Sequence, residues 1–432
     1  MVLAVIARCF HLEFVGLLFA GRVLSLICFV LLGATAYFGA VRCGYEGWVA
    51  ATPAILLVSD YSFSGWNATV RPDMAGLLLS ALCIVLTLVP TRRAVFAAAL
   101  CAAVAVSLKL TYVAAPVSVV IWLLWSRRHS YALWFCVISG VAVLVIAASF
   151  MVRGDPVLSQ VLIMRNVAAS FGGFVFLNQQ EWRQDSTKFL FAICFTGLWY
   201  GAKKREEPQG ILVGLYLVLT WLIAVTTSFN SGADNNYYLE PRVACALVVP
   251  FGVSALQPFW RRIAPVRAFM NAVVVLAFVI QPIMWIRTIV KATRDQSTTK
   301  GIARIVSGRN ILSTDSYFAA LSSEPEMLDP YLVTQLEKRA YWSSDPIVRK
   351  VNAQQYDFVI FRTPQGKIRP YHDEFFFDRA LMSAIQQNYV PVCTSSKHLV
   401  LLPINRPSGT SAADLEEAGC RQAIGALDKY IQ

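Results

Sequence analysis

A short polar stretch between two apolar runs holds three charged residues, Asp60, Arg71 and Asp73. It reads SDYSFSGWNATVRPDMAGLLLS over residues 59–80. Charged groups at the edge of a bilayer are costly unless they meet water, a partner or a ligand. An acid followed by Arg-Pro-Asp, with aromatic residues nearby, therefore predicts a surface that binds or transforms a ligand. The simpler interpretation is a hydrated loop in which Arg71 and Asp73 pair with each other.

Two other polar features also lie between apolar runs. Lys109 is a single ammonium group in the phrase SLKLTY, and its simplest role is to reach the membrane interface along its aliphatic stem. The phrase NSGADNNYYLEPR, residues 230–242, gathers small, amide, tyrosine and charged residues at the end of one run. The alternating direction of the runs puts both features on the side of Asp60 and Asp73. We therefore expect one shared polar face.

Motifs of several other catalytic classes are missing from the sequence. The four histidines are scattered singly, without HExxH or paired His/Cys spacing, so we expect no metal site built by the protein. No GxGxxG, P-loop or GxSxG phrase is present. Cys393 and Cys420 are the two cysteines of the polar tail, and they could form a disulfide if the tail lies outside the cytoplasm.

The composition is that of a membrane protein. Hydrophobic residues make up 56% of the 432 residues and charged residues 15%, against about 25% charged in a soluble domain. Residues 291–432 hold 17 basic and 15 acidic residues, so this part contributes +2 of the net +12 and the membrane part +10. That excess lies in short loops between apolar runs, which is typical of membrane topology and argues against nucleic acid as a partner.

About ten apolar runs approach the length needed to cross a bilayer. Five alternate loops between them carry the basic residues, which the positive-inside rule places in the cytoplasm. The polar stretches described above then face the periplasm or lumen. The runs are Phe14–Val41, Trp48–Ser59, Pro72–Val89, Ala94–Leu108, Leu110–Trp125, Tyr131–Val152, Phe189–Gly201, Ile211–Phe229, Val243–Leu256 and Phe269–Thr288.

This topology leaves the start of the chain on the outer side if the number of spans is even and the tail is outside. Residues 1–13 contain neither a secretory signal nor a complete span that could carry the start there. We therefore expect one further helix upstream, or one span more or fewer than counted. Between the later runs, the long outer loop 153–188 predicts an interfacial helix at Val157–Phe171, with packing on the bundle as the alternative.

The predicted fold is an all-α polytopic membrane bundle of about ten transmembrane helices, followed by a small extracytoplasmic α/β domain. The transmembrane domain is residues 1–290 and the soluble domain residues 291–432, where the composition becomes that of a soluble protein. Within the soluble domain we expect three strands, two helices and a closing helix. Their ranges are residues 310–315, 356–361 and 398–403 for the strands, and 330–339, 345–354 and 415–430 for the helices.

Three phrases on the outer face carry a resemblance: TVRPDMAGLLLS at residues 69–80, SLKLTYVAAPVSVVIWLL at 107–124 and GADNNYYLEPRVACAL at 232–247. GRVLSL precedes them at residues 21–26, and STDSYFAALSSEPEMLDPYLVTQLEK follows at 313–338. In this order and spacing they resemble the bacterial polytopic glycosyltransferases of the GT-C class, relatives of the protein mannosyltransferases and of the enzymes that add sugars to lipid A. The resemblance extends over nearly the whole chain.

The resemblance implies transfer of a sugar from a polyprenyl-phosphate donor to an acceptor glycan, lipid or protein on the extracytoplasmic face. Arg71, Lys109 and Arg242 would bind the phosphate and stabilise its charge as it leaves. No cofactor is identified, although carboxylates could hold a divalent cation together with the donor phosphate. The side chains expected to contact the sugar are Asn235, Asn236, Glu240, Tyr61, Phe63, Trp66, Tyr237 and Tyr238.

The sequence departs from the class at its start. Such enzymes carry an acid in the first outer loop, directly after the first helix, where it acts as general base on the acceptor hydroxyl. Here the chain begins where the second helix would approach, so the comparison with the class implies that the first helix and acidic loop are absent. The catalytic residue is therefore unassigned, with Asp73 and Asp60 as candidates. Orienting Arg71 is the simpler role for Asp73.

Two alternatives follow from the same residues. A transporter or flippase of lipid-linked sugars would share the cationic, aromatic face, but it should show polar residues along a path and often an internal repeat, which the sequence lacks. A truncated, catalytically inactive membrane scaffold would explain the missing acid. The expected location is the bacterial inner membrane, with the C-terminal domain in the periplasm. The expected partners are membrane lipids, a polyprenyl-phosphate-linked sugar and a cell-envelope acceptor.

Overall fold

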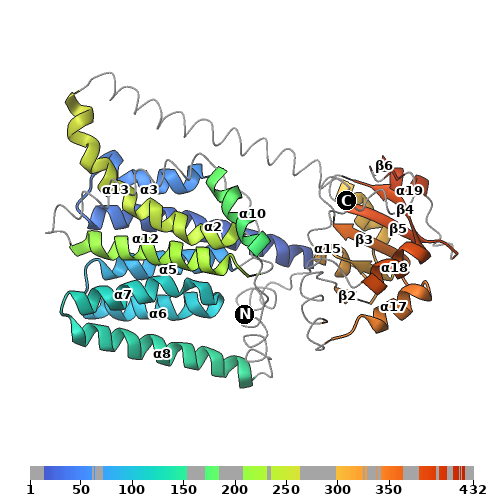
Figure 1. Cartoon of the computed structure of the whole chain (residues 1–432), viewed down its shortest axis with the longest axis horizontal. Coiled ribbons are helices and arrows are strands. Elements are labelled where there is room, and N and C mark those ends of the chain that lie inside the picture. The colour runs from blue at the N-terminus through green and yellow to red at the C-terminus, as the bar shows by residue number, and fades with distance from the viewer. Residues whose placement is uncertain are drawn as a thin grey trace. The chain divides into compact units, whose positions relative to one another are not determined.

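The structure is a computed structural model, and the chain divides into two compact units, Met1–Ile283 and Met284–Gln432. Helices make up the first unit, and the strands lie in the second (Figure 1). The residues that the structure describes are 14–60, 63, 72–152, 171–183, 208–230, 235–262, 298–324, 326–327, 337, 342–362, 379–395, 398–405, 412–417, 419 and 421–423.

Eight of the ten apolar runs are helical in the structure, and the other two, Phe189–Gly201 and Phe269–Thr288, lie outside the described residues. Long apolar segments form helices in a bilayer because every backbone polar group must then be paired within the segment. The helices are α2 (Phe14–Arg42), α3 (Gly47–Ser59), α5 (Asp73–Thr87), α6 (Arg92–Leu108), η1 (Leu110–Val113) with α7 (Ala114–Trp125), α8 (His129–Val152), α12 (Pro208–Thr227) and α13 (Leu239–Arg262).

Three described helical segments are long and apolar enough to cross a membrane by length and composition. They are Ala20–Arg42, His129–Val152 and Gln209–Thr227. Shorter apolar helices are Gly47–Ser59, Asp73–Thr87 and Leu110–Trp125. The expected count of about ten spans therefore stays a prediction.

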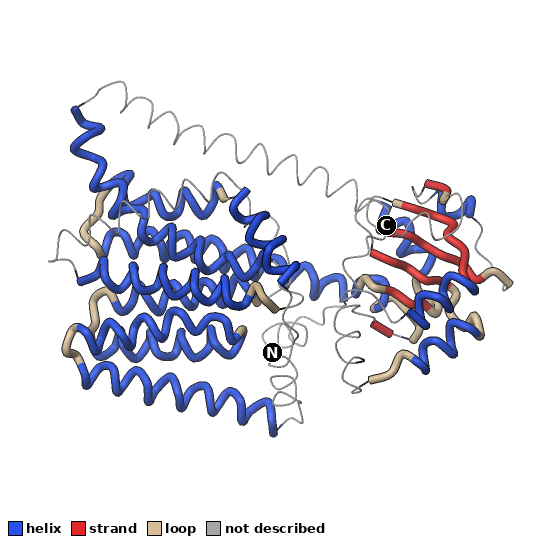
Figure 2. The backbone as a smooth tube through the Cα atoms, viewed as in Figure 1, coloured by secondary structure: helices blue, strands red, loops and turns tan. Residues whose placement is uncertain are grey.

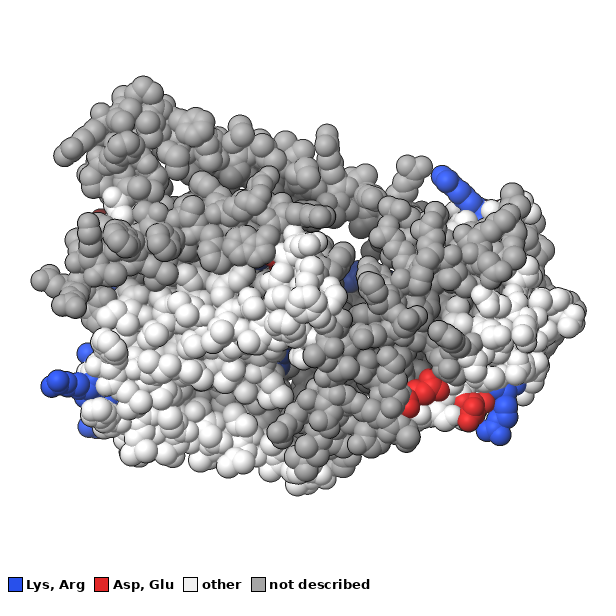
Figure 3. Space-filling view, in the orientation of Figure 1, with Lys and Arg blue, Asp and Glu red and all other residues white. Residues whose placement is uncertain are grey.

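The breaks between the helices separate a basic end of the bundle from a polar end. Thr91 caps α6 by accepting a hydrogen bond from the Ala94 amide (3.2 Å), as N-cap threonines do, and the exposed Arg92 and Arg93 follow. Arg42, the last residue of α2, reaches the carbonyl of Val85 near the end of α5 (3.3 Å). Exposed basic side chains gather at this end of the helical unit (Figure 3). The opposite ends of α3, α5 and α6 carry Asp60, Asp73 and Lys109.

A helix that the sequence did not predict, α10 (Phe171–Arg183), packs on the bundle near α12 and the short 3₁₀ turn η2 (Asn235–Tyr238). Its Leu177 forms a small buried cluster with Ala224 and Tyr238. The interfacial helix predicted at Val157–Phe171 lies almost entirely outside the described residues. The described part of this outer loop forms a packed helix, and the interfacial helix stays a prediction.

The second unit is built on a six-stranded mixed sheet with strand order β2-β1-β3-β5-β4-β6 (Figure 2). The β2-β1-β3 strands run parallel, and β5, β4 and β6 are antiparallel to their neighbours. The strands predicted at 310–315, 356–361 and 398–403 are confirmed as β1, β3 and β5. The strands are β1 (Ile311–Ser313), β2 (Glu326–Met327), β3 (Phe358–Arg362), β4 (Tyr389–Thr394), β5 (His398–Pro403) and β6 (Arg421–Gln422).

Helices cover both faces of this sheet. Successive strand residues point to opposite faces, so Val359 and Phe361 of β3 pack with α17 (Asp345–Asn352) and α18 (Arg379–Asn388). Phe358 and Ile360 pack instead with residues 302–306, α15 (Ser316–Ala319) and α19 (Ala412–Glu417). The prediction of a closing helix at 415–430 is wrong for residues 421–422. These residues form strand β6, which pairs with β4.

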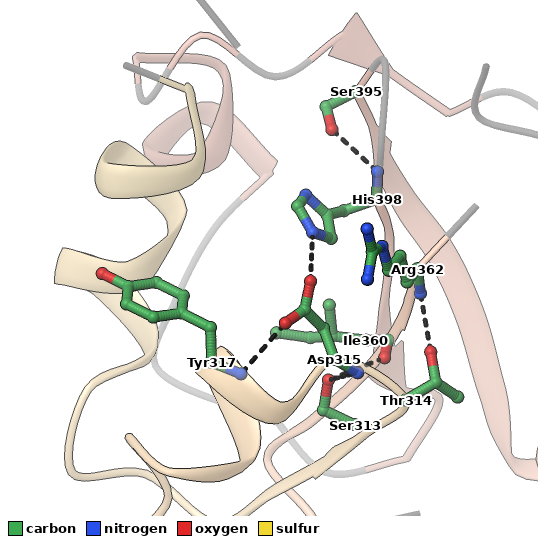
Figure 4. Close-up of polar contacts among 8 residues, drawn as sticks. All are labelled: Ser313, Thr314, Asp315, Tyr317, Ile360, Arg362, Ser395 and His398. Carbon is green, nitrogen blue, oxygen red and sulfur yellow. Dashed lines mark hydrogen bonds and ion pairs between the residues drawn. The ribbon is translucent and has the colours of Figure 1, made fainter. Parts of the chain in front are cut away.

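A polar contact links the end of β1 to β5, two strands that β3 separates in the sheet (Figure 4). Asp315, just after β1, accepts a hydrogen bond from the Tyr317 amide (2.9 Å) and contacts Nε2 of His398 on β5 (3.1 Å). Burial alone would raise the pKa of Asp315, but the His398 contact, the Tyr317 amide and the charge of Arg362 outweigh it and lower that pKa. Asp315 therefore stays ionised and ties the end of β1 to β5.

Cys393 on β4 is disulfide-bonded. Its predicted partner, Cys420, lies outside the described residues. The pairing of these two cysteines stays a prediction.

Candidate functional site

Four residues from three separate parts of the chain meet around one carboxylate. Asp73 begins α5, where the helix dipole favours a negative charge. Its Oδ1 lies 2.9 Å from Nζ of Lys109 and 3.4 Å from Nδ2 of Asn236. Lys109 also faces the ring of Tyr237, with Nζ 4.7 Å from the ring centroid. We call Asp73, Lys109, Asn236 and Tyr237 the lysine cluster.

The local backbone explains why Lys109 projects here. Its amide still closes the last turn of α6 on Ala105 (3.1 Å), but Lys109 itself is extended, and η1 begins directly after it. This break turns the side chain from the end of α6 toward the start of α5. A helix that continued through Lys109 would place an ammonium group among apolar side chains, which is costly.

Tyr112 also contacts Asp73 through its hydroxyl group. Its hydroxyl group lies 3.2 Å from the backbone oxygen of Asp73 and 3.3 Å from Oδ1, and the side chain is 1% exposed. Room for the ring depends on Gly76, because a Cβ atom there would lie 2.2 Å from Cε2 of Tyr112. Tyr112 follows Lys109 across the helix break, and its amide donates a hydrogen bond to the Lys109 carbonyl (3.0 Å), so the short turn η1 ties the two residues together.

Gly76→Ala is therefore expected to disturb the lysine cluster through Tyr112. The ring must move because a buried contact at 2.2 Å cannot persist, and overpacking of this kind costs roughly 1–3 kcal/mol. Thermal unfolding in detergent should show the loss, and Gly140→Ala on α8 is the matched control, since nothing lies within 4 Å of its added Cβ. Equal midpoints for the two variants would contradict the expected contact.

A second buried cluster surrounds Arg242 in the first turns of α13. Its Nη1 lies 2.6 Å from Oδ2 of Asp60 at the end of α3, and its Nη2 lies 2.5 Å from Oε2 of Glu181 on α10. The Arg242 side chain is 3% exposed, and the carboxylates are 6% and 2% exposed. Both terminal guanidinium nitrogens, Nη1 and Nη2, are thus paired with acids of this chain, which makes Arg242 a poor site for an added phosphate.

The other predicted residues fall in different places. Glu240 is 4% exposed, and its Oε1 accepts a hydrogen bond from the hydroxyl of Tyr216 (3.1 Å). The expected sugar-facing positions of Phe63 and Tyr238 are wrong, because both rings are fully buried. Phe63 packs on Phe29 at 5.6 Å between ring centroids. The structure does not describe Arg71, Tyr61 and Trp66, nor the side chain of Asn235.

The lysine cluster is suited to binding a phosphate group. The Lys109 side chain is 19% exposed and forms an ion pair with one carboxylate, whereas the buried Arg242 side chain forms ion pairs with two. Oδ1 of Asn236 is buried without a hydrogen-bond partner, and an unused buried acceptor costs free energy that a ligand hydroxyl could recover. In the described part of the chain, no group of three or more His, Cys, Asp or Glu residues is arranged to hold a metal ion.

Sequence reasoning missed Glu181 and Tyr112. Glu181 lies in the segment FGGFVFLNQQEWR, whose glycines and amides gave no clear helical or functional signal. Its only sequence-level signal is an acid beside Trp182 in a long outer loop. The pairing with Arg242 joins residues 61 positions apart and follows from the packing of α10.

Comparison with solved structures shows the fold of the chain. The structure is similar to that of ArnT from Cupriavidus metallidurans bound to undecaprenyl phosphate, with a TM-score of 0.56, 14% sequence identity and coverage of 93% of this chain and 86% of that one. It is also similar to ArnT of the same organism in the apo state, with a TM-score of 0.52, 15% identity and coverage of 88% and 83%.

No protein-family profile matches the sequence, and no curated protein matches it. At 14–15% identity the similarity shows the fold alone. Together with the apolar helices, it indicates an integral membrane protein with an ArnT-like fold.

Proposed function

We propose that this protein is a membrane glycosyltransferase that takes a sugar from a polyprenyl-phosphate donor. The observation that carries the proposal is the lysine cluster, in which a partly exposed ammonium group, an aromatic ring and an unused amide oxygen lie together at the end of the bundle. The structural neighbour was crystallised with undecaprenyl phosphate, and a lipid phosphate has the charge that Lys109 would bind.

The chemistry of transfer gives each of these groups a role. The acceptor hydroxyl oxygen attacks the anomeric carbon of the sugar, the bond from that carbon to the phosphate oxygen breaks, and the hydroxyl proton passes to a base. The charge that develops on the departing polyprenyl phosphate would be stabilised by Lys109. Asn236 would accept a hydrogen bond from a sugar hydroxyl through Oδ1, and Tyr237 would lie beside the sugar or phosphate.

Within this proposal, Asp73 holds Lys109 in place and is not the base. Its Oδ1 already has Lys109, Tyr112 and Asn236 within 3.4 Å, so this oxygen is occupied by groups of the protein itself. Asp60 is likewise taken up by Arg242. The base is left unassigned.

The proposed orientation places the lysine cluster at the outer face of the bacterial inner membrane and the C-terminal unit in the periplasm. Support comes from Arg42, Arg92, Arg93, Arg127 and Arg128, which are exposed at the opposite helix ends, as the positive-inside rule expects of cytoplasmic loops. The disulfide at Cys393 supports the same orientation.

Native mass spectrometry of the full chain in detergent tests the proposal. We expect the protein to retain undecaprenyl phosphate and to release undecaprenol, which has the same chain without the charge. Equal retention of the two lipids would contradict a phosphate site. Reconstitution into liposomes with a labelled polyprenyl-phosphate sugar, in the absence of acceptor, distinguishes a transferase from a transporter. Movement of the label across the liposome membrane would indicate a transporter.

A further inference from the structure

Asn178 on α10 joins three neighbouring elements through its amide. Its Nδ2 donates to the carbonyl of Phe174 (2.8 Å) and to Oγ of Ser228 (3.2 Å). Its Oδ1 accepts a hydrogen bond from the hydroxyl of Tyr238 on η2 (2.9 Å). Donors and acceptor of the amide are therefore both used, which fixes its orientation.

Tyr238 is held from several sides by this arrangement. The residue is fully buried, and its ring lies 5.9 Å from that of Trp221 on α12. The α10 end of the contact is anchored as well, because Phe174 stacks on Phe229 with ring centroids 3.8 Å apart. A buried tyrosine hydroxyl without a partner is costly, so the hydrogen bond to Asn178 selects this position of the ring.

Two other residues of η2 belong to the lysine cluster. Asn236 and Tyr237 precede Tyr238 in a turn of four residues, Asn235–Tyr238. Asn236 contacts Asp73, and the Tyr237 ring lies over Lys109. Any rotation of this short turn that follows loss of the Tyr238 anchor must move both contacts, since one turn of backbone carries all three side chains.

We infer that Asn178 is a positioning residue for the lysine cluster, acting through Tyr238 to hold Asn236 and Tyr237 against Asp73 and Lys109. The inference rests on the proposed function for the identity of the ligand. It assigns α10 a role in setting the shape of the site, although no residue of α10 belongs to the lysine cluster.

Hydrogen exchange on the full chain without ligand tests the positioning step by itself. Asn178→Ala and Tyr238→Phe should both raise exchange of the η2 amides, because each removes the hydrogen bond between Asn178 and Tyr238; Tyr238→Phe also removes the contact of the hydroxyl with Ser228. The matched control is Gln179→Ala, the exposed neighbour on the same helix, which should leave η2 unchanged. Unchanged η2 exchange in Asn178→Ala overturns the inference whether or not the protein binds a lipid.

Affinity for undecaprenyl phosphate then tests the link to the site. Each single variant should weaken binding by about 3- to 10-fold, the range for one neutral hydrogen bond. The double variant should be no weaker than the singles, because residues that act through one contact are not additive. Normal affinity in Asn178→Ala overturns the inference and leaves the proposed function standing. If the wild type prefers undecaprenol or binds both lipids equally, the proposed function fails instead.

Discussion

Lys109→Ala is expected to lower affinity for undecaprenyl phosphate by about 10- to 150-fold, the range for a hydrogen bond to a charged group. The substitution removes the partly exposed ammonium group of the lysine cluster and leaves Asp73 to repel the incoming phosphate. Titration of the purified protein with undecaprenyl phosphate, followed by native mass spectrometry, measures the change.

The single variant also leaves the buried carboxylate of Asp73 without its ion-pair partner, so a control must separate loss of binding from loss of stability. In the double variant Lys109→Ala with Asp73→Asn, no uncompensated charge remains, and the thermal midpoint should return toward that of the wild type. Binding should stay weak. A double variant that folds normally and binds undecaprenyl phosphate as tightly as the wild type would show that the phosphate binds elsewhere.

Arg242→Ala is expected to destabilise the helical unit by about 3–5 kcal/mol, which is the cost of breaking a buried ion pair from one side. Asp60 and Glu181 would then face each other without the guanidinium that separates them, and both side chains are at most 6% exposed. Since proteins are stable by only about 5–15 kcal/mol, the variant should show a much lower midpoint in detergent or fail to accumulate.

A neutral version of the Arg242 cluster distinguishes charge from packing. Arg242→Met combined with Asp60→Asn and Glu181→Gln removes the three charges and keeps side chains of similar size, so most of the lost stability should return. Retained binding of undecaprenyl phosphate in this triple variant would confirm that Arg242 does not hold the phosphate. Loss of binding with normal stability would reassign Arg242 to the phosphate site.

The helices were predictable because long apolar runs leave the backbone little choice in a membrane. The same argument could not find α10, since its segment contains two glycines and several polar residues and owes its position to tertiary contacts. In the second unit, β1, β3 and β5 carried apolar runs that mark buried strands, while β6 pairs at an edge with both residues exposed and gave no such signal.

The lysine cluster was predictable in outline for a topological reason. Asp73, Lys109, Asn236 and Tyr237 all stand at helix ends on one side of the alternating pattern, so the bundle brings them to the same end. What the pattern could not predict is the choice of partners. Asp73 pairs with Lys109, whereas Arg242 is neutralised by Asp60 and Glu181, and this division follows from how α3, α10 and α13 pack.

The most direct test of the central claim is an experimental structure of the full chain with undecaprenyl phosphate. We expect the phosphate group within hydrogen-bond distance of Nζ of Lys109, beside Tyr237 and Asn236. A phosphate seated on Arg242 with Lys109 still paired to Asp73, or on a different surface of the bundle, would contradict it.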